Sequence, residues 1–206
     1  MMGYTKVNLR DMSEMIEPEQ LEKIISDFSC PYNIDVEEFL RFKAVEFSKQ
    51  RLASTYLVFA SYKEQPVLVG YFALAQKYFH IDLKKKGVLG SNLRRRIRKF
   101  ATLDDDLHKY VVTAPLIGQL GKNYSHDHNK LITGDELLKI ACDTVAEAQR
   151  IVGGKIVYLE CEDIPSLRRF YEDNGFCDFG CRDLDGDEKG KFSGTYLVQM
   201  LKYLGE

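Results

Sequence analysis

The chain has 206 residues, about the length of one ordinary domain, with 45 % hydrophobic and 29 % charged residues, as is typical of soluble globular proteins. Its formal net charge of −2 excludes a global field that would draw it to nucleic acid or membranes, so such attraction needs a local patch. Neither the apolar run of a signal peptide nor the roughly 18 apolar residues of a transmembrane helix occurs, and the five cysteines are scattered. We therefore expect a cytoplasmic protein with reduced thiols that does not bind membranes.

The first third of the chain predicts a strand, two helices and a β-hairpin. Residues 5–10 favour a short strand, and residues 17–28 favour a helix with apolar side chains at helical spacing. Asp35 is the predicted N-cap of a second helix. Residues 55–62 are rich in β-branched and aromatic residues, and after a short turn residues 67–79 form a nearly continuous apolar run. These two segments predict an antiparallel pair.

A basic segment at about 80–107 interrupts this pattern, and we expect it to be an insertion between two strands. Ser91 or Asn92 can cap a short helix within it. Cations on such a helix can bind the phosphates of RNA or another polyanion, but a solvated helix balanced by neighbouring acids is the interpretation that we favour. The insertion could also form one wall of an acceptor site. Its basic residues are Lys84, Lys85, Lys86, Arg94, Arg95, Arg96, Arg98 and Lys99.

The remainder of the chain alternates strands and helices. Such alternation predicts parallel neighbours joined by right-handed crossovers, whereas the flanking hairpins predict antiparallel pairs. We therefore expect a mixed α/β sheet within a single domain over residues 1–206. The predicted elements are a strand over 110–120, a polar loop over 123–132, a helix from Thr133 to the glycines at 153–154, a strand over 155–161, a helix from Pro165 to Gly175, and strands over 176–181 and 192–201 around a charged loop.

The helix that opens at Thr133 begins with a pattern that permits two interpretations. Thr133 and Glu136 fit a capping box, so the segment could be nothing more than a well-capped helix. The same first turn has unpaired N–H groups and a partial positive charge, which together favour a phosphate. Gly134 at this turn would let a ligand approach the backbone closely.

A second motif lies in residues 165–176, which read PSLRRFYEDNGF and end a helix with the pattern Y-x-x-x-G-F from Tyr171 to Phe176. Together with the strand, loop and helix of residues 116–138, it resembles the GNAT (N-acetyltransferase) superfamily. The resemblance implies a mixed, mainly antiparallel sheet with a splayed central parallel strand pair, flanked by helices. The family's glycine-rich phosphate loop is reduced here, because Gly134 alone of its glycines is present.

The resemblance also implies acetyl-CoA as acyl donor and no metal. The pantetheine arm would pair with the backbone of Leu120, Gly121 and Lys122 like an added strand. The pyrophosphate would rest on backbone amides of the following loop and helix start, which need no particular side chains. Those amides belong to Asn129, Lys130, Leu131, Ile132, Thr133, Gly134 and Asp135.

The mechanism that the resemblance implies is direct attack of an amine on the thioester. Tyr171 matches the family's tyrosine and is the candidate general acid for the leaving thiolate, although a buried core aromatic would fit equally well. Glu160 is the candidate base, with Glu162 and Asp163 as alternatives. Gln119 stands where some relatives carry a base, and an amide cannot serve as one, so a positioned water is the further alternative.

Two functions from different classes follow. The first is an N-acetyltransferase whose acceptor is a small amine, a peptide amine or an aminoacyl group on RNA. The second is a non-catalytic domain of the same fold that binds a CoA-like ligand or nucleic acid, which the reduced glycine loop keeps open. The C-terminal strands could pair with a second copy to form a homodimer. A metal is not expected at His126 and His128, because no further ligands follow at recognisable spacing.

Overall fold

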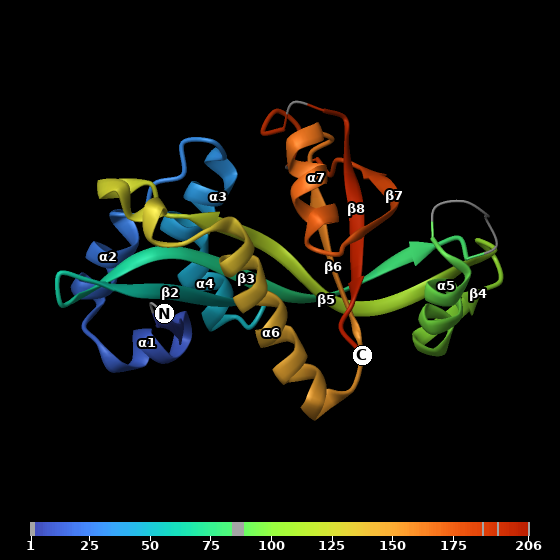
Figure 1. Cartoon of the computed structure of the whole chain (residues 1–206), viewed down its shortest axis with the longest axis horizontal. Helices are drawn as coiled ribbons and strands as arrows, with labels where there is room; N and C mark the ends of the chain where they lie inside the picture. The colour runs from blue at the N-terminus through green and yellow to red at the C-terminus, as the bar shows by residue number, and fades with distance from the viewer. Residues whose placement is uncertain (1–2, 84–88, 187, 193, 206) are drawn as a thin grey trace. The chain divides into compact units, whose positions relative to one another are not determined.

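The computed structural model describes residues 3–83, 89–186, 188–192 and 194–205 (Figure 1). The predicted basic residues Lys84, Lys85 and Lys86 lie outside these ranges. The chain divides into two compact units, which we call the first and the second unit. The first comprises Met1–Ala75 and Gly118–Ala141, and the second comprises Gln76–Ile117 and Cys142–Glu206. The single domain over residues 1–206 stays a prediction.

The first unit begins with β1, five short helical segments and a β-hairpin. The predicted strand over 5–10 is too long, because the Asn8 side chain accepts the Arg10 N–H and starts a helix at Leu9. The predicted cap Asp35 is also wrong, since the Asn33 side chain accepts the N–H of Val36 instead. The elements are β1 (Tyr4–Asn8), α1 (Leu9–Met15), α2 (Pro18–Ser26), α3 (Ile34–Glu38), the π-helix η1 (Phe39–Lys43), α4 (Ala44–Lys49), β2 (Ser54–Tyr62) and β3 (Gln65–Ile81), whose last residues belong to the second unit.

The basic insertion contains more structure than the predicted helix. Gly90 is the N-cap of its helix, so Ser91 and Asn92 lie inside the first turn rather than capping it. A strand that was not predicted follows the helix. It spans Ala101–Asp104 and pairs with the next strand along the chain. The elements here are α5 (Ser91–Ile97), the 3-10 helix η2 (Arg98–Phe100) and β4 (Ala101–Asp104).

The remaining elements match the predicted order. Two of them, β5 and α6, pass from one unit into the other. The predicted polar loop holds a short 3-10 segment, η3. The elements are β5 (Lys109–Lys122), η3 (Ser125–Leu131), α6 (Gly134–Val152), β6 (Ile156–Cys161), α7 (Pro165–Asp173), β7 (Cys177–Asp183) and β8 (Tyr196–Tyr203). Within the described ranges, no helix is both long and apolar enough to cross a membrane.

Strand pairing confirms the mixed, mainly antiparallel sheet. The strand order is β1-β2-β3-β5-β6-β8-β7, and β4 pairs with β5 beside this path. The β1–β2, β2–β3, β6–β8 and β7–β8 pairs are antiparallel, whereas β5 and β6 are parallel. In Figure 1, α7 lies beside β6, β7 and β8 of the second unit.

Within the second unit, β5 and β6 pair in parallel through Leu116 with Tyr158 and Ile117 with Leu159. β5 continues to Lys122 in the first unit. The residues predicted to pair with a pantetheine arm, Leu120 to Lys122, are the last three of this strand.

Each unit has its own apolar core. In the first, helices α1 to α4 cover the hairpin, and the buried rings of Phe28 and Tyr71 meet edge to face at 5.1 Å between centroids. In the second, Phe79 contacts Tyr158 and Phe179 with ring centroids 4.8 and 4.5 Å apart.

Candidate active site

The predicted site residues fall in both units. The residues predicted to bind the cofactor lie between Leu120 and Asp135 in the first unit, whereas Glu160 and Tyr171 lie in the second.

Asn123 fixes the end of β5 in the first unit. Its side chain is fully buried, donates to the Leu68 carbonyl at 2.9 Å and accepts the N–H groups of Ser29 and Ser125 at 3.0 and 3.1 Å. Its own N–H donates to the Val69 carbonyl. A buried amide whose side-chain oxygen and nitrogen are both bonded holds the backbone in one path. Asn123 was predicted only as part of a polar loop, because its partners Leu68 and Ser29 lie far away in the sequence.

The loop after β5 is held by contacts that bring several predicted residues together. Lys122 Nζ donates to the Asn129 carbonyl at 3.1 Å, and the Tyr4 hydroxyl donates to the Leu131 carbonyl at 3.1 Å. His126 and Asp127 both have left-handed backbone angles, with φ of 53° and 62°, so the loop turns sharply between them. Ile132 is buried, which anchors the loop directly before α6.

The start of α6 confirms the predicted capping box. The N–H and the hydroxyl of Thr133 both donate to Glu136 Oε2, at 2.8 and 2.9 Å, and the Glu136 N–H donates to Thr133 Oγ1 at 3.1 Å. These hydrogen bonds from Thr133 lower the pKa of the Glu136 carboxyl, so it is ionised at neutral pH. The Gly134 N–H has no acceptor among the described residues. The helix start thus has anion-binding character, and the Glu136 carboxylate already satisfies part of it.

Gly121 has a packing role of its own. A Cβ at this position would lie 2.5 Å from Val36 Cγ1, so a larger residue cannot fit without a shift of α3. Gly70 on β3 also leaves no room for a side chain, since an added Cβ would lie 2.8 Å from the Gly121 carbonyl oxygen. The two glycines therefore let β3, β5 and α3 approach closely, independently of any cofactor.

Gln119 is the remaining polar side chain of this strand end. Its Nε2 donates to Asp35 Oδ2 at 2.9 Å. Its Oε1 is buried and has no partner in the described part of the chain. Gln119 therefore orients Asp35 rather than acting as a base.

Tyr171 lies in the second unit, near the end of α7, and the Y-x-x-x-G-F motif explains how it is held. Gly175 adopts a left-handed conformation with φ of 81°. Its N–H donates to the Glu172 carbonyl, and the Phe176 N–H donates to the Tyr171 carbonyl at 3.0 Å. These two bonds, with the Phe176 ring packed on the Tyr171 ring at 5.9 Å, form a Schellman motif. The motif therefore ends the helix and fixes the tyrosine.

Tyr171 as a residue is 9 % exposed. Burial raises the pKa of the phenol, and the nearby Cys161 thiol raises it further. Among the described residues no group forms a hydrogen bond with this hydroxyl. The hydroxyl is therefore available to donate to a ligand.

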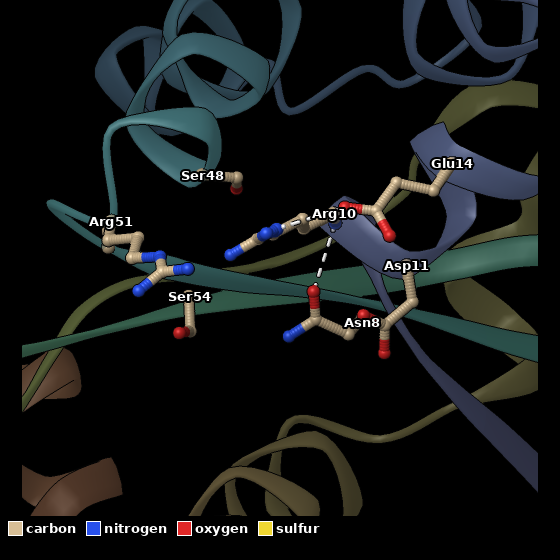
Figure 2. A pocket seen from close by; sticks show the side chains of 8 residues that line it. Asn8, Arg10, Asp11, Glu14, Ser48, Arg51 and Ser54 are labelled. Carbon is tan, nitrogen blue, oxygen red and sulfur yellow. Dashed lines mark hydrogen bonds and ion pairs between the residues drawn. The ribbon is translucent and has the colours of Figure 1, made fainter.

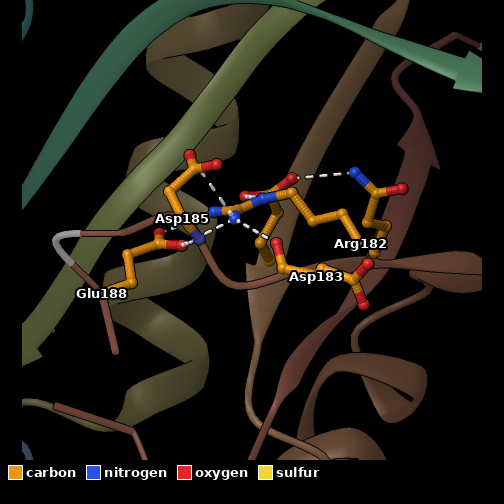
Figure 3. Close-up of polar contacts among 6 residues, drawn as sticks. Arg182, Asp183, Asp185 and Glu188 are labelled. Carbon is orange, nitrogen blue, oxygen red and sulfur yellow. Dashed lines mark hydrogen bonds and ion pairs between the residues drawn. The ribbon is translucent and has the colours of Figure 1, made fainter. Parts of the chain in front are cut away.

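Arg182 is the centre of an ion-pair network (Figure 3), and Glu160 near the end of β6 is bound to it. Glu160 Oε2 accepts from Arg182 Nε at 2.7 Å, and its Oε1 accepts from Gln199 Nε2 at 2.8 Å. Arg182 also donates to both carboxylate oxygens of Glu188 at 2.7 Å. The Glu188 bonds, together with those to Glu160, raise the pKa of the guanidinium. With both its oxygens bonded, Glu160 has the geometry of a structural group rather than of a base.

This geometry predicts the outcome of Glu160→Gln. Its unfolding free energy should fall by about 1–2 kcal/mol, because the charged bond to Arg182 is weakened. In an assay of acetyl transfer, the reaction that the GNAT resemblance implies, its rate should stay within about threefold of the wild type, whereas loss of a true general base would lower the rate by about 100-fold or more. The pH dependence of kcat/KM measures the difference. Loss of the acidic limb in Glu160→Gln, but not in Glu162→Gln, would assign the base to Glu160.

The other polar candidates are also bound within the protein. Asp163 accepts from the Tyr196 hydroxyl at 2.6 Å and from Arg168 at 2.9 Å, and these bonds lower the pKa of its carboxyl. His126 lies 3.2 Å from Asp27. Over the described ranges, no group of three or more His, Cys, Asp or Glu side chains could hold a metal ion.

Comparison with known proteins gives a likeness in structure alone. No family model and no curated protein matches the sequence. A tyrosine-to-phenylalanine mutant of KacT is 16 % identical, with 95 % of this chain and 93 % of that chain covered and a TM-score of 0.59. AtaT complexed with acetyl-methionyl-tRNAfMet is also 16 % identical, over 95 % and 94 % of the two chains, with a TM-score of 0.60. AtaTR bound with AcCoA is 16 % identical over 95 % and 91 %, with a TM-score of 0.52.

The chain has the GNAT fold. The expected order of the GNAT elements is confirmed, with β5, the loop over 123–133 and α6 followed by β6 and α7. The parallel neighbours expected at the centre of the GNAT sheet are β5 and β6. The basic insertion, with α5 and β4, precedes this central pair.

Proposed function

We propose that this GNAT-fold protein is an N-acetyltransferase that moves an acetyl group from acetyl-CoA to an amine acceptor. The observation that carries the proposal is the strand end, loop and helix start of the first unit, where the Asn123 side chain fixes the end of β5 and Gly134 opens α6. A pantetheine arm with its two amide groups would pair as an added strand with the backbone of the last residues of β5. The acetyl-CoA complex of a structural neighbour supports the same donor.

The cofactor residues keep the roles proposed from the sequence. The backbone of Leu120, Gly121 and Lys122 would bind the pantetheine arm. The loop from Asn129 to Asp135 would bind the pyrophosphate, because its helix start offers the Gly134 N–H and a partial positive charge. In that loop the side chain of Lys130 pairs with Asp127 at 2.9 Å on the surface, so it would remain outside the phosphate contacts.

The proposed reaction is direct transfer. The neutral amine nitrogen attacks the thioester carbonyl carbon, a C–N bond forms, and the C–S bond breaks with the electron pair on sulfur. The Tyr171 hydroxyl donates its proton to the leaving thiolate. The raised pKa of the phenol keeps this proton on Tyr171 at neutral pH until the transfer. Both carboxylate oxygens of Glu160 are hydrogen-bonded to other groups. We therefore assign the removal of the amine proton to a water molecule.

The acceptor is an amine on a small molecule, a peptide or RNA. The complex of AtaT with acetyl-methionyl-tRNAfMet supports including an aminoacyl group on RNA among the candidates. The α-amine of such a group is a suitable nucleophile once it is neutral, since its ordinary pKa is near 8.

A second candidate function is nucleic-acid binding without catalysis, and the basic helix α5 favours it. Arg95 is exposed there, and the helix carries no acid in its first turn. Two neighbouring guanidinium groups are partly occupied, however, because Arg96 lies over the Tyr203 ring at 5.2 Å and Arg98 lies over the Tyr110 ring at 5.6 Å. Fewer cations then remain for phosphates than the sequence suggests.

Labelled acetyl-CoA distinguishes the two functions. We expect saturable binding by calorimetry and label transfer to at least one acceptor among polyamines, peptides and aminoacyl-tRNA. Binding without transfer to any acceptor would favour the non-catalytic alternative. A folded protein that binds neither acetyl-CoA nor longer acyl-CoAs would overturn the proposal.

Glu136→Gln should strengthen acetyl-CoA binding. The substitution removes a negative charge from the helix start that the pyrophosphate would occupy, so the dissociation constant should fall by about two- to fivefold. The capping box should weaken at the same time, lowering the free energy of unfolding by about 0.5 kcal/mol. Calorimetry and thermal unfolding measure the two effects. Glu22→Gln is the control, because Glu22 is an exposed acid on α2. If acetyl-CoA binds equally tightly to both variants, the change in net charge alone explains the effect.

A further inference from the structure

A polar cavity of about 360 Å³ lies in the first unit, where α1, α4 and the start of β2 meet (Figure 2). Its lining contains two arginines, Arg10 and Arg51, and two serines, Ser48 and Ser54. Figure 2 shows both guanidinium groups directed into the same space, with one serine on either side. None of these residues belongs to the proposed acetyl-CoA site.

Arg51 occupies a backbone position that suits glycine. It follows the end of α4 with a left-handed φ of 59°, and its N–H donates to the Ser48 carbonyl at 3.2 Å. Helices commonly end on a glycine in this conformation, because any side chain there is strained. A strained residue points to a role for its side chain. In the described part of the chain, the Arg51 guanidinium has no ion pair or hydrogen bond.

Ser48 supplies the second, independent observation. The residue is 5 % exposed, and its hydroxyl is buried with no hydrogen-bond partner among the described residues. A buried hydroxyl without a partner is destabilising, and a ligand oxygen in the cavity would satisfy it. Ser54 contributes an exposed hydroxyl at the first residue of β2.

The acidic residues of the cavity limit the chemical class of ligand that it can bind. Glu14 accepts from Arg10 Nε at 3.1 Å, and Asp11 also lines the cavity. The two acids balance the two arginines, so the cavity does not attract polyanions at long range. They also accept hydrogen bonds, which suits a ligand that carries hydroxyl groups beside its anionic group.

We propose that this cavity binds a phosphate monoester that carries neighbouring hydroxyl groups, as a sugar phosphate does. Arg10, Arg51, Ser48 and Ser54 approach from several sides, which matches the tetrahedral oxygens of a phosphate better than the two coplanar oxygens of a carboxylate. Asp11 and Glu14 accept from the ligand's hydroxyl groups. The phosphate monoester could belong to a free metabolite or to the 5′ end of an RNA.

Calorimetry with ribose 5-phosphate tests the proposal. We expect binding of ribose 5-phosphate at millimolar concentration or below, about tenfold weaker binding of inorganic phosphate, and none of ribose. A short RNA with a 5′-phosphate, compared with its 5′-hydroxyl twin, distinguishes the two sources. Binding of the RNA pair with a preference for the phosphate, but not of ribose 5-phosphate, would assign the ligand to RNA. Failure of all phosphate probes to bind the folded protein would overturn the proposal.

Two variants separate a ligand site from a structural feature. Arg51→Gly should unfold at a higher temperature than the wild type, because strain is relieved, and should bind at least about tenfold more weakly. Lys63→Gly is the matched control, since Lys63 is a cation with φ of 51° that lies outside the cavity lining, and its affinity should not change. Ser48→Ala should keep or raise stability while weakening binding by about threefold. Equal losses of affinity in Arg51→Gly and Lys63→Gly would contradict the site.

Discussion

Replacement of Tyr171 by phenylalanine should lower acetyl transfer by about 100- to 1,000-fold, the range for loss of a positioned general acid. The physical reason is that the C–S bond breaks with a developing thiolate, and the Tyr171 hydroxyl would be the proton donor. The measurement is release of free CoA thiol under single-turnover conditions with the best acceptor, so that product release does not hide the chemical step.

The structure predicts that this loss will occur without unfolding. The Tyr171 hydroxyl has no hydrogen-bond partner among the described residues, so its removal leaves no protein group unsatisfied. The ring contacts with Phe170 and Phe176 remain in the variant. The melting temperature should therefore stay the same or rise, and acetyl-CoA binding should change little.

Tyr158→Phe is the matched control for Tyr171→Phe. Tyr158 lies in the same unit, and burial raises the pKa of its phenol as it does for Tyr171. Its ring packs against Phe79 in the core, so its hydroxyl has no proposed role in the reaction. Tyr171 would have only a packing role, the alternative kept above, in either of two cases. The first is a similar rate for Tyr171→Phe and the wild type, and the second is an equal loss of rate in both variants.

The fold was predictable where local patterns determine it. The strands predicted over 110–120 and 155–161 lie close to β5 and β6, and the spacing of Thr133 and Glu136 predicted the capping box at α6. Elements that depend on one side chain, or on pairing with another strand, were harder to predict. The Asn8 side chain starts α1 inside a segment that looks like a strand, and β4 is formed because Ala101–Asp104 pairs with β5.

The candidate site was less predictable, because long-range contacts decide what its residues can do. From the sequence, Glu160 was a suitable base. In the structure Arg182, 22 residues further along the chain, binds its carboxylate. Gly121 matched a backbone role toward the cofactor, but its contact with Val36 gives it a packing role as well. Tyr171 is the opposite case, since its Schellman motif is encoded locally by Gly175 and Phe176.

Gly134→Trp should weaken acetyl-CoA binding by about 100-fold or more, which corresponds to about 2.7 kcal/mol. Gly134 is the first residue of α6, and the N–H groups of this turn would hold the pyrophosphate. An indole at this position would cover those groups. Calorimetry with acetyl-CoA measures the loss, and Gly134→Ala should retain most of the affinity because its methyl group is small.

The Gly134 variants should fold, which makes the binding result decisive. Gly134 is not among the glycines with a left-handed backbone, and both tryptophan and alanine have higher helix propensity than glycine. Gly90→Trp is the control, because Gly90 is the N-cap of α5 in the second unit and a Cβ there meets nothing within 4 Å. If Gly134→Trp binds acetyl-CoA as tightly as Gly90→Trp does, the start of α6 is only a capped helix. If it alone loses binding, the capping box and the anion site share one turn, and tighter binding by Glu136→Gln becomes the expected consequence.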